Sequence, residues 1–180
     1  RTFSDARSEN HGRLGARVLA EEKVLAELPP GLVRLILGAV AMHNRARAPR
    51  RSRPELALLT RLVRDADKLD IYRIMIAHFC GETPKNDVVA LHLRDEPDGW
   101  SPAVVQALRE ERLASYADMR VENDFKLLLL SWVYDLNFPA SYQTLLKLER
   151  LDALGALLPR DAVVRDVHAK AVAHARRRAA

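Results

Sequence analysis

Two histidines occupy positions where a helical side chain faces inward rather than toward solvent. His11 precedes Leu14 and Val18 by three and seven residues, so a helix here places the imidazole on the apolar face. His43 follows the apolar positions of 35–40 at the same helical spacing, and it lies at the end of the next predicted helix. Both imidazoles are therefore candidates for a site inside the fold.

A carboxylate joins them on the third predicted helix. Asp67 lies four residues from both Val63 and Ile71, which puts it on the apolar side of a segment that is otherwise rich in charge. Asp65 lies about 200° away around the same helix, so the two acids do not easily serve one site. Asp70 lies three residues after Asp67, so its carboxylate could reach the same site or accept a hydrogen bond from the N–H group of a ligand histidine.

Imidazole and carboxylate together suit a divalent Mn, Fe, Ni or Zn ion and need no thiolate. Three successive helices thus each contribute one metal-ligand type of side chain: His11, His43 and Asp67. Two simpler interpretations stay open. Each histidine could be a core residue with a satisfied hydrogen bond, and Asp67 could pair with a neighbouring base such as Arg64, Lys68 or Arg73.

The elements that must carry these residues are all helical. The predicted helices span about 8–28, 31–44, 52–80, 101–116, 121–136, 139–154 and 160 to the C-terminus, and turn-forming residues interrupt 81–100. Ser52 and Glu55 have the spacing of a capping box, and Ser101 with Pro102 is a typical helix start. We predict an all-α fold, a compact multi-helix bundle in a single domain over 1–180.

Composition narrows the classes further. The chain is 48% apolar and 29% charged, and no window is long and uncharged enough to span a membrane, so we expect a cytoplasmic protein without a membrane partner. The single cysteine, Cys80, excludes an internal disulfide and a thiolate zinc site, and we expect it to be buried. The net charge is +5, but the basic runs 43–53 and 174–178 lack aromatic residues, so we do not expect nucleic acid as the main partner.

Three segments carry a family resemblance: ENHGRLGARVL (9–19), AVAMHNR (39–45) and LVRDADKLDIYR (62–73). In order and spacing they resemble the later part of the HD-domain metal-dependent phosphohydrolase superfamily, in its multi-histidine branch. The resemblance implies an all-α HD-like bundle, with the metal site in about 8–75 and a C-terminal helical part in about 101–180. It also implies hydrolysis of a phosphate monoester or diester, with nucleotides among the candidate substrates.

The resemblance gives each matching position a role. Asp67 resembles the final metal-ligating aspartate, which would hold one divalent ion together with an upstream His-Asp doublet. His11 and His43 resemble the two additional histidines, which would hold a second ion bridged to the first (one or two ions of Mn, Fe, Ni, Zn or Mg). A metal-activated water would be the nucleophile. Lys68 and Arg45 are the predicted substrate-binding residues, and Arg47, Arg50 and Arg51 would extend a basic rim that attracts an anionic, phosphorylated small molecule or nucleotide.

The sequence also departs from the family pattern. No His-Asp dipeptide occurs in the 180 residues, so the resemblance implies that this doublet lies N-terminal to Arg1. No Gly-Tyr-Pro follows His43, so we do not expect cyclic-dinucleotide hydrolysis. The alternative to an enzyme is a catalytically inactive HD-like helical module for binding or signalling. The sequence leaves a homodimer open.

Overall fold

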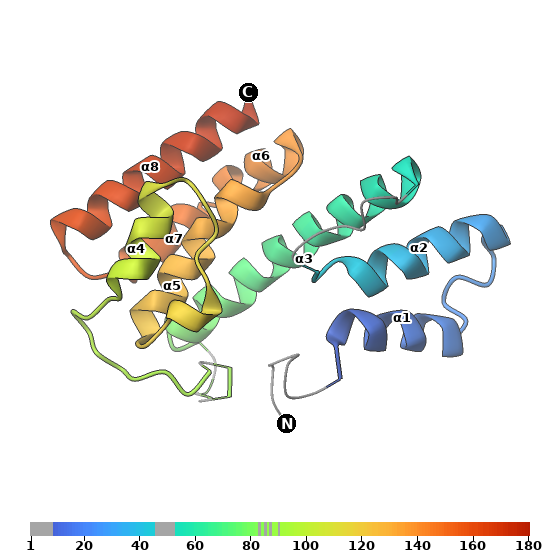
Figure 1. The fold of residues 1–180 in the computed structure, drawn as a ribbon, viewed down its shortest axis with the longest axis horizontal. Helices are drawn as coiled ribbons and strands as arrows, with labels where there is room; N and C mark the ends of the chain where they lie inside the picture. The colour runs from blue at the N-terminus through green and yellow to red at the C-terminus, as the bar shows by residue number, and fades with distance from the viewer. Residues whose placement is uncertain (1–8, 46–52, 83, 85, 87, 90) are drawn as a thin grey trace. The chain divides into compact units, whose positions relative to one another are not determined.

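The computed structural model describes residues 9–45, 53–82, 84, 86, 88–89 and 91–180. The α-helices are α1 (His11–Glu21), α2 (Pro30–Met42), α3 (Pro54–Phe79), α4 (Pro102–Arg109), α5 (Glu122–Ser131), α6 (Pro139–Lys147), α7 (Arg150–Ala156) and α8 (Ala162–Ala179) (Figure 1). Two 3-10 helices, η1 (Tyr116–Asp118) and η2 (Trp132–Asp135), flank α5. The predicted all-α class is confirmed, and the described residues include no strand beyond an isolated bridge between Arg94 and Val121.

Residue contacts divide the chain into two compact units, Arg1–Asp67 and Lys68–Ala180, and the long helix α3 runs from the first into the second. The prediction of a single domain over 1–180 stays a prediction. Each unit is described by itself below. None of the helices in the described part of the chain is both long and apolar enough to cross a membrane.

Three predicted helices end earlier than their sequences suggested, for one physical reason. Lys23, Glu111 and Glu149 each have a φ of 52°, in the left-handed region, where an α-helix cannot continue. Accordingly α1 ends at Glu21, α4 ends at Arg109, and the predicted helix 139–154 divides into α6 and α7. Glycine is the usual residue at such helix ends, so charged residues gave no signal of the breaks.

Other predicted boundaries have mixed outcomes. Ser101 is the N-cap residue of α4 and Pro102 its first residue, as predicted. Ser52, the first member of the predicted capping box, lies outside the described residues. Cys80, which we expected to be buried, is exposed just beyond the end of α3.

The first unit contains little apolar core. Within it α1 packs along α2 (Figure 1), and the buried residues among those described are small or polar: Gly12, Ala39, His43, Thr60 and Asp65. Leu14 and Val18, expected on a buried face, are 37% and 45% exposed because α1 turns the side bearing Gly12 toward α2. In the described part of this unit, large apolar side chains are therefore at most partly buried.

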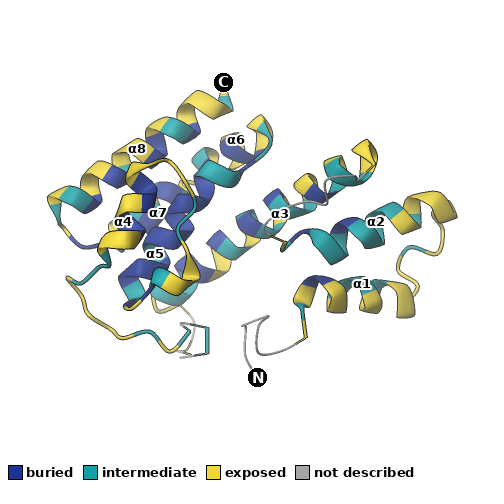
Figure 2. Ribbon diagram, in the orientation of Figure 1, coloured by how far each residue is buried: buried dark blue, intermediate teal, exposed yellow. Residues whose placement is uncertain are grey.

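The second unit has a dense apolar core, which appears as the dark blue parts of α4 to α8 in Figure 2. Helix α5 is buried on almost every side, as a helix with four consecutive leucines requires. The core is formed by Val104, Leu108, Leu127–Leu130, Val133, Tyr142, Leu145, Leu151, Leu154, Val164 and Val167, among others. Helix α8 contacts α4, α5, α6 and α7 and so closes this unit.

A buried carboxylate organises the start of two helices in the second unit. Asp124 is fully buried, and its two oxygens accept from the backbone N–H groups of Ser101, Arg120 and Val121 and from the Ser101 hydroxyl, at 2.6–3.1 Å. A carboxylate has enough lone pairs to accept all four hydrogen bonds. This one side chain therefore fixes the start of α4 beside the start of α5.

We expect Asp124→Asn to lower the free energy of unfolding by about 1–3 kcal/mol. The amide NH2 group replaces one carboxylate oxygen, and because it cannot accept hydrogen bonds, the donors that face it lose their acceptor. Chemical denaturation measures the change. Asp152→Asn, at an exposed position of α7, is the control and should change stability by less than about 0.5 kcal/mol. Equal stability of Asp124→Asn and the parent chain would contradict this account of the carboxylate.

Candidate metal centre

Three helices of the first unit bring His11, His43 and Asp67 together. Each residue offers one ligand atom, and these three atoms all lie within 4.8 Å of one another. The two Nε2 atoms of the histidines are 3.1 Å apart, and Nε2 of His43 is 3.7 Å from Oδ2 of Asp67. Two ligands of a tetrahedral zinc lie about 3.3–3.6 Å apart, so small movements would let all three share one ion.

His43 is buried and held with its Nε2 atom toward the other two ligands. It follows α2 directly, in helical conformation, and its Nδ1 atom lies 2.7 Å from the carbonyl oxygen of Val40. The carbonyl can only accept a hydrogen bond, so Nδ1 donates it, and in the neutral imidazole Nε2 is then the nitrogen that can bind a metal ion. A backbone carbonyl behind the imidazole is the usual way in which a metal-binding histidine is oriented.

His11 is the first residue of α1, and it is exposed rather than buried as the spacing predicted. Nδ1 of His11 lies 3.4 Å from the side-chain nitrogen of Asn44, the residue after His43. The amide of Asn44 contains both a donor and an acceptor, so it can support either tautomer of His11.

Gly12 allows α1 to approach the end of α2. A Cβ atom on Gly12 would lie 2.9 Å from the carbonyl oxygen of Val40 and 3.1 Å from Oδ1 of Asn44. A Cβ atom on Gly15, one turn further along α1, would make only an ordinary contact of 3.5 Å with the side chain of Val40. The close approach of α1 to α2 therefore occurs at the residue next to the ligand His11. In the sequence, only a glycine in the first turn of the helix indicates this approach.

Asp67 is the acid of α3 that joins the histidines. Its side chain is 36% exposed, whereas Asp65 is almost completely buried elsewhere around the helix. Asp70 is exposed and forms an ion pair with Arg73 at 2.8 Å, and it is not in the group with the histidines. The structure thus separates Asp65 and Asp67, as their angular spacing predicted.

The predicted substrate-binding residues have different surroundings. Arg45 is exposed just beyond α2. Lys68 is buried in the second unit, where its ammonium forms an ion pair with the carboxylate of Asp135 and donates to the Asp135 carbonyl at 3.0 Å. Their roles toward a substrate stay predictions, and Arg47, Arg50 and Arg51 lie outside the described residues.

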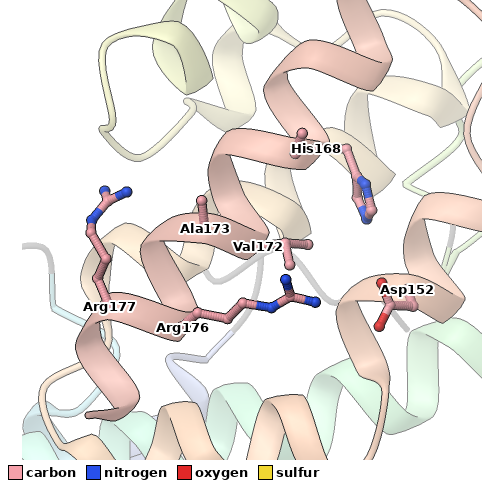
Figure 3. Close-up of a pocket in the computed structure, with 7 residues that line it drawn as sticks. Asp152, His168, Val172, Ala173, Arg176 and Arg177 are labelled. Carbon is pink, nitrogen blue, oxygen red and sulfur yellow. The ribbon is translucent and has the colours of Figure 1, made fainter.

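The second unit contains an open hollow of about 400 Å³ between α7 and α8 (Figure 3). Asp152 and Arg176 extend over it from opposite helices, and His168 lies at one end. Nε2 of His168 is 2.9 Å from the Leu151 carbonyl, and the ring occupies the space that a Cβ atom on Gly155 would need. His168 therefore has a packing role between these helices.

The chain matches no protein-family model, no curated protein and no solved structure. The resemblance to the HD-domain superfamily consequently depends on the three motifs alone and stays a prediction. The class that the fold and the site define is an all-α protein with a His-His-Asp group that could hold a metal ion.

We expect Gly12→Ala to weaken metal binding at least tenfold and to lower the melting temperature, because the added methyl group separates α1 from the end of α2. Gly15→Ala is the matched control. It adds the same methyl group where the methyl makes only an ordinary contact with Val40, and it should raise stability by up to about 1 kcal/mol through helix propensity. Isothermal titration with Zn²⁺ and thermal unfolding measure both effects, and equal behaviour of the two variants would contradict the role of Gly12.

We expect Asp135→Asn to lower the free energy of unfolding by about 2–4 kcal/mol, because it leaves the buried ammonium of Lys68 without its carboxylate. Adding Lys68→Met to that variant should recover part of the loss, since it removes the uncompensated charge. Asp70→Asn, which breaks an exposed ion pair, is the control with an expected effect below about 1 kcal/mol. Urea denaturation measures all three, and an effect of Asp135→Asn as small as the control would contradict a structural ion pair.

Proposed function

We propose that this protein is a divalent-metal-dependent phosphohydrolase that acts on a phosphate monoester or diester, with nucleotides among its candidate substrates. The observation that carries the proposal is the grouping of His11, His43 and Asp67, whose ligand atoms lie within 4.8 Å of one another. These are the same three positions at which the motifs resemble the metal ligands of the HD-domain superfamily. The sequence pattern and the geometry therefore support the same site.

The donor set fits a divalent ion. Two imidazole nitrogens and one carboxylate oxygen suit Zn, Fe, Mn or Ni, and the carbonyl of Val40 already holds His43 in the required tautomer. A divalent ion bound here would supply Lewis-acid polarisation of a phosphoryl oxygen and activation of water. The protein's own contribution is to hold the three ligands at the ends and middle of helices, where backbone contacts limit their movement.

The charge near the centre favours an anionic substrate. Arg45 is exposed two residues after the His43 ligand, and the sequence that follows it to position 53 contains four further arginines. Basic side chains raise the local concentration of phosphorylated molecules through their positive potential. We propose that Arg45 contributes to this attraction, whereas Lys68 forms an ion pair with Asp135 in the second unit.

One observation favours the alternative, a catalytically inactive HD-like helical module for binding or signalling. The group that the described residues form at this centre has three protein ligands. A three-ligand group could bind a metal for stability alone, without hydrolysis. The experiment on the parent chain must therefore measure metal content and hydrolysis separately.

The test measures bound metal by elemental mass spectrometry and hydrolysis with p-nitrophenyl phosphate, bis(p-nitrophenyl) phosphate and a nucleotide panel. We expect stoichiometric metal in the parent chain, and its loss in His43→Ala and Asp67→Ala because each variant removes one of three ligands. Asp70→Ala is the matched control, since it removes an exposed acid one turn further along α3 and should keep both metal and activity.

The outcomes separate the hypotheses. Metal and hydrolysis that are lost together in both ligand variants would support the phosphohydrolase. Metal without hydrolysis of any ester would favour the inactive module. Absence of metal from a normally folded parent chain would contradict the metal centre itself.

A further inference from the structure

The candidate ligands His43 and Asp67 come from different helices, so a contact between these helices must fix the distance between the two side chains. His43 directly follows the last residue of α2, and Asp67 lies in the middle of α3. The last carbonyl groups of an α-helix have no partner within that helix and form the negative end of its dipole. A cationic donor on α3 that binds these carbonyls would hold both ligands together.

Arg64 is that donor. Its Nη1 atom donates to the backbone carbonyl of His43 at 3.0 Å and to the carbonyl of Arg45 at 2.8 Å. A guanidinium nitrogen contains two N–H groups, so one nitrogen can make both hydrogen bonds. The first acceptor belongs to the ligand residue itself, so Arg64 restrains the backbone from which the imidazole projects.

Arg64 also lies on the same side of α3 as Asp67. Residues three apart on a helix are neighbours on its surface, and Arg64 precedes Asp67 by three. One turn of α3 therefore contacts the end of α2 twice, through the guanidinium at the backbone and through the carboxylate, 3.7 Å from Nε2 of His43. Because these two contacts lie side by side on α3, they fix both the orientation of the end of α2 and its distance from α3.

We infer that Arg64 is a positioning residue that sets the geometry of His43 against Asp67 and thereby sets the metal affinity of the centre. The inference depends on the proposed metal-binding function for its effect on affinity. Its geometric part, the restraint of His43 by Arg64, holds for the ion-free protein as well. Arg64 contacts neither metal nor substrate in this role, so its loss acts through the two ligands.

The affinity test titrates the full chain with Co²⁺, whose visible absorption reports both occupancy and ligand geometry. We expect Arg64→Ala to weaken Co²⁺ binding at least tenfold and to change the shape of the absorption bands, since supporting residues of metal sites commonly contribute tenfold to hundredfold in affinity. Arg64→Lys keeps a cation with several donors and should recover part of the affinity. Arg61→Ala is the matched control, because Arg61 bonds to the carbonyl of Ala57 within its own helix.

A second measurement follows the ion-free protein, so that the two proposals can fail separately. Imidazole ¹⁵N spectra report the tautomer of His43, which its hydrogen bond to Val40 holds with the proton on Nδ1. We expect Arg64→Ala to shift the His43 resonances and mix its tautomers, and Arg61→Ala to leave them unchanged. If circular dichroism shows that Arg64→Ala does not fold, Arg64→Gln takes the place of Arg64→Ala in both measurements. Arg64→Gln retains amide N–H donors but lacks the positive charge.

Each outcome bears on one proposal. Parent-like Co²⁺ affinity and parent-like His43 resonances in Arg64→Ala would overturn the positioning role. A parent chain that binds no Co²⁺ and none of the other divalent ions would overturn the proposed function, and the imidazole spectra would then decide on Arg64 alone. Weaker Co²⁺ binding that Arg64→Lys partly recovers, together with shifted His43 resonances, would support the inference.

Discussion

The last turn of α2 is the constraint on which the candidate centre depends. Its carbonyl at Val40 orients His43, and the same carbonyl limits how closely α1 can approach, which only glycine at position 12 permits. The carbonyl of His43 is in turn held from α3 by Arg64. A few unpaired backbone groups at one helix end thus position ligands from three helices, because the end of a helix is where backbone carbonyls remain free to bind side chains.

The two units are stabilised in different ways. The second unit buries large apolar side chains around α5 and closes them with α8, so its stability comes mainly from the hydrophobic effect. In the described part of the first unit, the buried residues are small or polar, and directed hydrogen bonds hold the elements together. Directed contacts specify geometry more narrowly than apolar contacts do, which suits a unit whose ligands must meet within a few ångströms.

Sequence reasoning succeeded where one helix face was sufficient evidence. It placed His43 on a buried face and separated Asp65 from Asp67, and the structure agrees at both positions. It failed where a local backbone conformation decided the end of a helix, or where contacts with another helix decided the exposure of a side chain. Lys23, Glu111 and Glu149 end helices without glycine, and His11 is exposed although its spacing matched an apolar face.

The sequence by itself determined the all-α class, the order of the helices and the residue types that could hold a metal, because helical periodicity and ligand chemistry are local properties. Only the tertiary structure decided that Gly12 rather than Gly15 makes the close approach, that Arg64 binds the end of α2, and that Lys68 pairs with Asp135. These facts depend on groups separated by many residues along the chain. Periodicity indicates which way a side chain faces, and the packed fold alone decides what it meets there.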